Sequence, residues 1–285
     1  FNLTMDARFL WMRQKRVQGS HFANLKQASA ANQLVINRRI DPGMSEVFPW
    51  EDIPAAHDKM LDNKHPFPVH TDNGAATADA DIVLLAVKPQ VMQDVCRALP
   101  RERKPGQLII SIAAGISCDS LENWLGAGTA IVRCMPNTPS LVQAGATGLY
   151  AADDVSDAQK AMAREILGSV GIAFWFDEEK ELDAVTAVSG SGPAYFFLLM
   201  ESLIEAAKAQ GLDAGTARQM VLQTAWGAAQ LAITSEAGPD VLRQQVTSPG
   251  GTTAAALNVF EEAGFREQVQ AAVAAARERS EELAG

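Results

Sequence analysis

The sequence predicts two domains in order, an α/β domain with a mostly parallel sheet and then an all-α domain. Between about residues 79 and 178, short apolar runs rich in β-branched residues alternate with helical segments, which is typical of a parallel sheet covered by helices. After Glu179 no strand-like run remains. The chain has 285 residues, which corresponds to two domains at roughly 150 residues each. We therefore assign residues 1–178 to the α/β domain and residues 179–285 to the helical domain.

The expected strands are short and almost wholly apolar, like parallel strands that are buried on both faces. They cover residues 81–87, 107–112, 130–135 and 171–176, with a weaker strand-like run at 148–150. Helices are predicted over residues 91–99, 118–125 and 156–169. Ser117 or Asp119 is the candidate N-cap of the second helix.

The helical domain is predicted as helices over residues 194–210, 213–235, 240–245, 253–262 and 265–283. Pro193 precedes the first of these helices and Gly211 follows it, the usual asymmetry of proline at a helix start and glycine past its end. Residues 195–200 are apolar around most of the helix circumference. Such a helix is buried all round, either in a large core or against another subunit.

Composition and charge restrict the partners. The formal net charge is −10 and the isoelectric point is about 4.9, which argues against a nucleic acid or an anionic membrane as partner. No apolar run of about 18 residues is free of charge, and the first four residues lack the order of a signal peptide. Cys96, Cys118 and Cys134 form no C-x-x-C pair and are typical of buried, reduced thiols. We expect a cytoplasmic protein that acts on a small molecule.

The histidines are confined to one end of the chain. All four precede residue 71, so residues 71–285 contain none. Chemistry in that larger part runs without an imidazole acid, base or metal ligand, and we expect no metal site.

Three of the expected strands end abruptly in turns of small or proline residues. These turns are residues 86–89, 113–115 and 135–139. Ligands of an open parallel sheet bind beyond the carboxyl ends of its strands, and small residues there let a flat cofactor approach the backbone. Each turn alone is also consistent with an ordinary connection, but three in equivalent positions favour a binding edge.

Two further segments combine glycines with hydroxyl side chains. Residues 189–193, Ser-Gly-Ser-Gly-Pro, fit either hydrogen bonding to a ligand or a flexible joint between the domains. Residues 246–256 lead a glycine-rich turn straight into a helix, whose free N–H groups and dipole favour an anion. The turn has neither a lysine nor a Walker pattern, so a small carboxylate fits better than a nucleoside triphosphate. The plain alternative is an N-cap at Thr252 or Thr253.

Together these segments resemble the pyrroline-5-carboxylate reductase family. The resemblance runs from about Thr71 to the C-terminus, with the motifs in the family's order and spacing. The joint presence of Ser-Gly-Ser-Gly-Pro-Ala-Tyr and Thr-Ser-Pro-Gly-Gly-Thr-Thr is highly specific. The matching strings are residues 71–73, 86–90, 111–115, 132–139, 183–195 and 242–253.

The resemblance implies a Rossmann-like first domain and a helical second domain that interlocks with another subunit, giving a homodimer that often assembles further. The active site of the family lies near the dimer interface. There, NADPH or NADH gives hydride to the C=N carbon of 1-pyrroline-5-carboxylate, and the product is L-proline, in the last step of proline biosynthesis. The residues implied to lie along the cofactor are Asn73, Ala86, Val87, Lys88, Pro89, Ala113 and Ala114.

The resemblance also implies the substrate residues. Ser248, Gly251, Thr252 and Thr253 would hold the carboxylate and the ring nitrogen, and Glu179 would line the site. Thr253 is the catalytic candidate, because its hydroxyl can hydrogen-bond the nitrogen that gains a proton as the neighbouring carbon gains hydride. A site of this kind needs no histidine.

Residues 1–68 depart from the family pattern. They suggest a helix at 5–17, a strand at 33–36 and a turn at 41–43, but no Gly-x-Gly turn for the pyrophosphate. Their only glycines are Gly19 and Gly43. Three explanations stand: the stretch is out of frame or mis-assigned, the chain is a diverged relative that lost cofactor binding, or the segment folds differently yet binds. The choice between NADPH and NADH rests on this same segment.

Two other functions compete with the reductase. The first is a non-catalytic dimeric relative that keeps only the helical domain's role as a scaffold. The second is a related hydroxyacid dehydrogenase, which uses a lysine on the long interdomain helix as an acid. Lys208 lies near the end of that helix, which makes it a poor candidate for the acid.

Overall fold

The structure is a computed structural model that describes residues 72–100 and 103–284. The helix expected at 5–17, the strand at 33–36 and the turn at 41–43 lie outside these described residues. The chain divides into two compact units, and the described residues of the first are 72–81, 98–100 and 103–105. The second unit, residues 82–97 and 106–285, holds the sheet and the C-terminal helices.

The described residues of the first unit include one short helix, α4 (Asn73–Thr77), which the sequence did not predict. Asp72 is its N-cap, because the carboxylate of Asp72 accepts a hydrogen bond from the N–H of Ala75. Lys104 forms an ion pair with Asp81 in the same unit.

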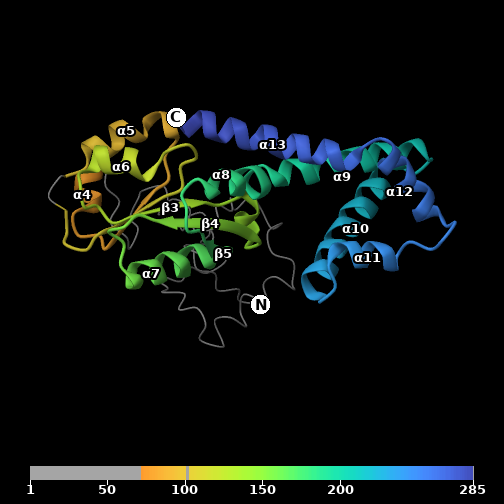
Figure 1. Ribbon diagram of the computed structural model, residues 1–285, viewed down its shortest axis with the longest axis horizontal. Coiled ribbons are helices and arrows are strands. Elements are labelled where there is room, and N and C mark those ends of the chain that lie inside the picture. The colour runs from red at the N-terminus through yellow and green to blue at the C-terminus, as the bar shows by residue number, and fades with distance from the viewer. Residues whose placement is uncertain (1–71, 101–102, 285) are drawn as a thin grey trace, which may run out of the picture. The chain divides into compact units, whose positions relative to one another are not determined.

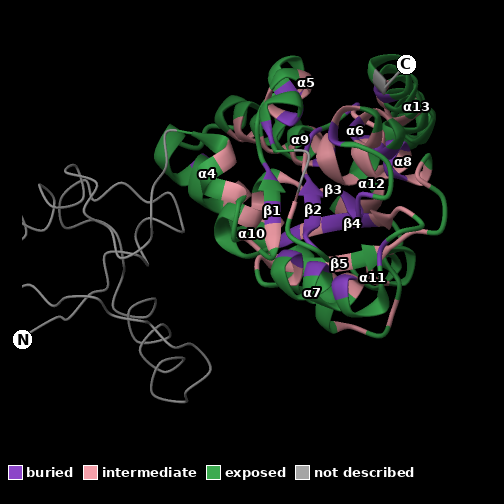
Figure 2. Cartoon of the chain, turned by 90° about the vertical axis from the view of Figure 1, so that its left-hand side faces the viewer, coloured by how far each residue is buried: buried purple, intermediate pink, exposed green. Residues whose placement is uncertain are grey.

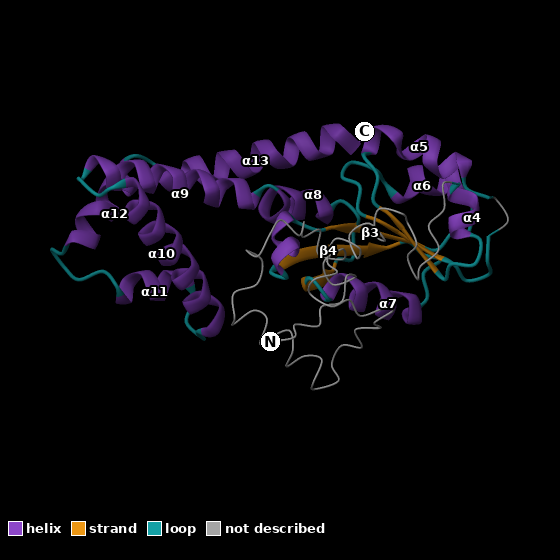
Figure 3. Ribbon diagram, turned by 180° about the vertical axis from the view of Figure 1, so that it is seen from behind, coloured by secondary structure: helices purple, strands orange, loops and turns teal. Residues whose placement is uncertain are grey.

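The sheet, which is drawn in orange in Figure 3, has five strands in the order β1-β2-β3-β4-β5, and Figure 2 labels each of them. Every neighbouring pair is parallel except β3 and β4, which are antiparallel. The mostly parallel sheet is therefore confirmed, with β4 longer than the run at 148–150 that the sequence suggested. The bounds are β1 Ile82–Leu85, β2 Leu108–Ser111, β3 Ile131–Met135, β4 Gly145–Ala151 and β5 Gly171–Trp175.

Helices cover both faces of this sheet. α6 (Cys118–Leu125) and α7 (Asp157–Gly168) lie on opposite faces (Figure 1). Ser117 caps α6, as predicted, by accepting the N–H of Ser120. A capping box between Ser156 and Gln159 starts α7. α5 (Pro89–Ala98) begins directly after β1, and η2 (Thr138–Val142) follows β3.

The core is the layer between the central strands and α7. Ile110, Val132 and Leu149 are completely buried on three neighbouring strands, and Ala163 and Leu167 of α7 belong to the same cluster. Figure 2 shows this buried layer along the middle of the sheet. The near-continuous apolar runs of β2 and β3 follow from burial on both faces.

The helical part begins with a continuous helical stretch rather than a joint. α8 (Glu181–Val185), the π-helical turn η3 (Thr186–Gly190) and α9 (Gly192–Ala209) follow one another, so the flexible joint considered for residues 189–193 is wrong. α10 (Ala214–Thr234), α11 (Pro239–Gln245), α12 (Thr252–Glu262) and α13 (Phe265–Ala284) complete the chain.

Pro193 leaves one carbonyl near the π-helical turn without its helical donor. Pro193 has no N–H to donate to the carbonyl of Ser189, four residues earlier, so that carbonyl lacks its helical donor. The N–H of Ser191 instead bonds the carbonyl of Thr186, five residues back. The Nδ2 of Asn137 donates to the freed Ser189 carbonyl at 3.1 Å. The side chain of Asn137, in the turn after β3, therefore supplies the hydrogen bond that the Ser189 carbonyl lacks within the helix.

The apolar helix α9 is not buried within one chain. Phe196, Phe197 and Leu198 are 65, 62 and 65 % exposed. Residues 181–209 are also long and apolar enough to cross a membrane by length and composition alone, with a mean hydropathy of 1.2, a test that core helices of soluble proteins also pass. Of the two environments that the sequence predicted for this helix, a large core in its own chain is wrong.

Candidate active site

The carboxyl ends of β1, β2 and β3 lie at one edge of the sheet. The three strands are parallel, and their registers pair Leu85 with Ser111 and Ser111 with Arg133. The three turns of small residues singled out in the sequence therefore follow neighbouring strands at the same edge, which is where an open parallel sheet binds its ligands.

The residues predicted to contact a cofactor behave in two ways. Ala86, Val87, Lys88 and Ala114 are exposed after their strands, whereas Pro89 is half-buried and Ala113 is buried. Within the described part of the chain, the backbone N–H groups of Val87, Lys88 and Ala114 have no hydrogen-bond partner. Small exposed residues with free donors fit a flat cofactor that carries acceptor oxygens. Asn73, the remaining residue predicted to contact the cofactor, is the first residue of α4 and belongs to the first unit.

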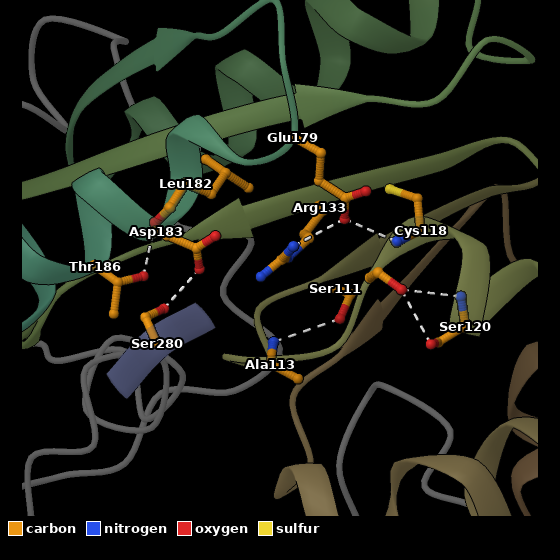
Figure 4. Close-up of polar contacts among 11 residues, drawn as sticks. Ser111, Ala113, Cys118, Ser120, Arg133, Glu179, Leu182, Asp183, Thr186 and Ser280 are labelled. Atoms are coloured by element: carbon orange, nitrogen blue, oxygen red, sulfur yellow. Dashed lines mark hydrogen bonds and ion pairs between the residues drawn. The ribbon is translucent and has the colours of Figure 1, made fainter. Parts of the chain in front are cut away.

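Glu179 connects this edge to the helical part (Figure 4). Its Oε1 accepts hydrogen bonds from Nη1 of Arg133 and from the N–H of Cys118, both at 2.8 Å. The side chains of Arg133 and Glu179 are only 7 and 23 % exposed. The thiol of Cys118 is a further hydrogen-bond partner of the same carboxylate. The carboxylate is thus fixed by Arg133 and by the start of α6.

Two buried thiols lie near this ion pair. Burial, and then the charge of Glu179, raise the pKa of Cys118 far above its usual value. Burial raises the pKa of Cys134 to about 12, and Arg133 opposes this shift. Neither thiol is a nucleophile at neutral pH, because only the thiolate reacts. In residues 72–100 and 103–284, no group of three or more His, Cys, Asp or Glu side chains is arranged to hold a metal ion.

The turn after β3 and the segment before α9 are brought together. The side chain of Asn137 donates to the carbonyl of Ser189, and its Oδ1 accepts the N–H of Ala146 at 2.9 Å. A Cβ at Gly190 would lie 2.8 Å from Cε of Met135, so the flexible end of the Met135 side chain lies directly against this glycine. The two motifs therefore form one structural unit.

The glycine turn before α12 leaves its helix start free. Gly251 is the N-cap and makes no side-chain capping bond, so the N-cap considered at Thr252 or Thr253 is wrong. Gly250 takes a positive φ of 69°, which favours glycine. The N–H of Gly251 bonds the carbonyl of Ser248 at 3.0 Å. Among the described residues, the N–H groups of Thr252, Thr253 and Ala254 have no partner, which makes this helix start a donor set for an anion.

The structure does not link the two halves of the predicted site within one chain. No hydrogen bond or ion pair in the described ranges joins residues 248–253 to the strand ends or to Glu179. α12 packs on α13 instead. One half is thus the sheet edge with Glu179, and the other is the free start of α12.

Sequence reasoning missed Arg133 and Asn137 as site residues. Arg133 carried a usable signal, because it is a charged residue inside an otherwise apolar strand that is buried on both faces. Such a charge requires a partner. Nothing local in the sequence identified Glu179 as that partner.

Comparison with protein families supports both domains. A family model described as pyrroline-5-carboxylate reductase dimerisation matches residues 179–283. A second, described as NADP oxidoreductase coenzyme F420-dependent, matches residues 52–115. This second match begins before Thr71, so the likeness reaches further toward the N-terminus than the sequence analysis expected.

Individual relatives agree with these matches. The chain is 57 % identical over 212 residues to the pyrroline-5-carboxylate reductase of Pseudomonas aeruginosa, covering 74 % of this chain and 78 % of the relative. It is 38 % identical over 260 residues to that of Haemophilus influenzae, covering 91 and 90 %. This second alignment is longer than the 215 residues from Thr71 onward, so it includes residues before Thr71.

Solved structures show the same relationship. The pyrroline-5-carboxylate reductase from Coxiella burnetii has a TM-score of 0.73 and 42 % identity, covering 80 % of this chain and 86 % of that one. The Plasmodium falciparum pyrroline carboxylate reductase, solved with NADP bound, has a TM-score of 0.69 and 33 % identity, covering 78 and 86 %.

Removing Arg133 tests the buried ion pair. We expect Arg133→Ala to lower the free energy of unfolding by about 3 kcal/mol, because it leaves a largely buried carboxylate without its charged partner. Urea unfolding at neutral pH measures this change. Lys180→Ala is the matched control, since its ion pair with Glu178 is exposed, and it should leave the midpoint unchanged. Equal effects of the two substitutions would contradict the assigned role.

The buried thiols predict a pH response. The folded pKa of Cys134 lies above the unfolded value of 9.0, so its contribution to stability is complete below pH 9 and is lost as the pH rises toward about 12. Cys118 shifts in the same direction. We expect neither thiol to react with a disulfide-exchange reagent in the native protein at pH 8, and both to react after denaturation. Peptide mapping by mass spectrometry measures this, and rapid native labelling of either residue would refute it.

Proposed function

This chain belongs to the pyrroline-5-carboxylate reductase family, and on that premise we propose that it reduces 1-pyrroline-5-carboxylate to L-proline with NAD(P)H. The observation that carries the proposal is the start of α12, where a neutral glycine turn presents three free N–H groups to a small anion. The substrate is such an anion, with a single carboxylate beside its C=N bond.

The turn supplies the substrate contacts that we propose. The N–H groups at Thr252 and Thr253, together with the hydroxyl of Ser248, hold the carboxylate. Gly251 contributes by having no side chain, so the ligand can approach the backbone. The helix dipole adds to the attraction for negative charge without a lysine or arginine in the turn.

The chemistry is the addition of hydride to carbon and of a proton to nitrogen. When bound, the reduced nicotinamide supplies the hydride. Thr253 is the catalytic residue in this proposal, and its hydroxyl hydrogen-bonds the ring nitrogen and fixes which face of the C=N bond is presented. Orientation of this kind is worth ~7 kcal/mol or more, so no histidine is required.

Glu179 is proposed to line the substrate pocket with its carboxylate. Arg133 and the start of α6 hold Oε1, so the carboxylate has a fixed position. A negative oxygen near the ring nitrogen favours its protonated form, and this is the form that accepts hydride more readily. A carboxylate fixed in advance does this without reorganising during the reaction.

The cofactor is NAD(P)H, held at the sheet edge. We propose that Ala86, Val87, Lys88 and Pro89 after β1, and Ala113 and Ala114 after β2, lie along it. The free N–H groups of Val87, Lys88 and Ala114 support this assignment, because they offer donors at the carboxyl ends of the strands.

A homodimer completes the proposed enzyme. The exposed apolar face of α9 needs a covering surface, and a second copy of the helical domain supplies one of matching character. The separation of the α12 turn from the sheet edge within one chain supports an arrangement in which each active site combines a sheet edge with a turn from the other subunit. We place the domain boundary between residues 178 and 179, after the last strand, and the enzyme in the cytoplasm, without a nucleic acid or membrane partner.

The competing functions have less support. Lys208 forms an ion pair with Glu205 on the exposed surface of α9, two residues before Gln210, which caps the end of the helix, so it is a poor acid for a hydroxyacid dehydrogenase. A non-catalytic scaffold is not favoured by any feature of the described residues. Oxidation of NADPH and NADH in the presence of 1-pyrroline-5-carboxylate, with proline identified as product, tests the proposal. The absence of both turnover and cofactor binding would overturn it.

Truncating Thr253 tests the catalytic residue. We expect Thr253→Ala to lower kcat/KM for the substrate. The loss should correspond to about 1–3 kcal/mol of transition-state stabilisation, the effect of one lost hydrogen bond. Thr253→Ser keeps the hydroxyl and should retain most of the activity. Thr234→Ala, which removes a hydroxyl bonded only within α10, is the matched control. Unchanged steady-state kinetics of Thr253→Ala would refute the role.

A charge on α9 tests the dimer. Phe197 lines a groove of about 430 Å³ with residues of α9 and α10, and it is largely exposed in one chain. We expect Phe197→Asp to separate the subunits, because a buried carboxylate without a partner is costly. Phe197→Leu keeps the apolar surface and should remain dimeric. Light scattering measures the mass, and a dimeric, stable Phe197→Asp would contradict the interface.

A further inference from the structure

We propose that Asp183 and Ser280 are positioning residues for the cofactor, because their hydrogen bond seats the last turns of α13 on Gly115 and so fixes the turn from Ala113 to Gly115. The inference rests on the proposed function, which places the cofactor along that turn. It extends the proposed function by giving α13, the C-terminal helix, a role in holding the turn from Ala113 to Gly115.

The hydrogen bond itself is buried and long-range. Oγ of Ser280 donates to Oδ1 of Asp183 at 2.7 Å, and 97 residues separate the two in the chain. Ser280 is 6 % exposed and Asp183 is 7 % exposed. Figure 4 shows Ser280 on α13 facing Asp183 on α8. A hydrogen bond to a buried carboxylate is among the stronger ones in a protein, and leaving that carboxylate unpaired is costly. The pair therefore holds α13 at a defined place on α8.

The same end of α13 touches the cofactor turn. Gly115 is buried with a positive φ of 73°, and a Cβ there would lie 2.8 Å from the carbonyl oxygen of Leu283. Leu283 is three residues after Ser280, which is about one helical turn. The backbone of α13 thus lies directly against Gly115, at a distance that only glycine permits.

The other flank of the turn is fixed by the sheet. The N–H of Ala113 donates to Oγ of the fully buried Ser111 at 3.4 Å, and the N–H of Ile112 donates to the carbonyl of Leu85. Among the described residues, the N–H groups of Ala114 and Gly115 make no hydrogen bond. The outer half of the turn is therefore held by packing against α13 rather than by the sheet.

The Asp183–Ser280 bond and the packing of α13 on Gly115 together predict that losing the bond weakens cofactor binding but not substrate binding. If α13 loses its bond to Asp183, the support on Gly115 loosens and the outer half of the turn becomes less ordered. Cofactor binding then costs more conformational entropy. Among the described residues, no hydrogen bond or ion pair joins the substrate turn before α12 to this pair, so substrate affinity should not change. Glu179 keeps its own bonds to Arg133 and Cys118.

The test is a set of three variants of the full-length enzyme. Ser280→Ala removes the donor, Asp183→Asn keeps an acceptor oxygen for Ser280, and Arg279→Gln breaks an exposed ion pair on the same helical turn. We expect Ser280→Ala to raise the KM and the Kd for NAD(P)H by about two- to tenfold, the effect of one hydrogen bond. The KM for 1-pyrroline-5-carboxylate and kcat should change by less than twofold. Asp183→Asn should retain most of the cofactor affinity of the parent enzyme. Arg279→Gln should have the same KM and Kd for NAD(P)H as the parent.

Two outcomes would overturn the inference. A lower Tm of Ser280→Ala with unchanged cofactor KM and Kd would show a purely structural bond. Equal losses for cofactor and substrate would show a general disturbance of the site. An inactive parent enzyme would count against the proposed function, whereas an active parent with unaffected variants would count against this inference alone.

Discussion

The pairing of Glu179 with Arg133 is the constraint on which the arrangement of the candidate site depends. Arg133 lies on a buried strand, where an unpaired charge would be strongly unfavourable. Its partner comes from the segment that follows the last strand, and the same carboxylate oxygen accepts the first N–H of α6. One oxygen thus joins β3, the helix start beside the cofactor turn and the entry to the helical domain.

A second connection between the domains uses a helix defect. Pro193 deprives the Ser189 carbonyl of its helical donor, and Asn137, from the turn after β3, provides the replacement. The helical stretch from α8 to α9 therefore stays continuous and is bonded to the sheet edge at its weakest point. Glu179 and Asn137 attach the helical part to the carboxyl ends of the strands, and the Asp183–Ser280 pair holds α13 on α8. The sheet edge at the candidate site is thus held by polar contacts, while α9 presents an exposed apolar face.

Sequence reasoning recovered most of the elements in the described part of the chain. Apolar runs predicted β1, β2, β3 and β5 to within about two residues, because strands buried on both faces allow few polar positions. Pro193 and Gly211 bracketed α9, and Ser117 was recognised as the cap of α6, because these residue types have local conformational preferences. The helix start before α12 was less predictable. Gly251 rather than a threonine occupies the N-cap, since the cap is decided by backbone angles and not by which residue carries a hydroxyl.

The sequence by itself determined the alternation of strands and helices, the small residues at the strand ends and the glycine turn before α12, because periodicity, side-chain size and chain flexibility act over a few residues. Only the tertiary structure decided which side chains meet. Arg133 and Glu179 are 46 residues apart and Asp183 and Ser280 are 97 apart, and their pairing follows from strand register and helix packing. The exposure of α9 was also decided at this level, because whether an apolar helix is covered depends on what packs against it and not on its own composition.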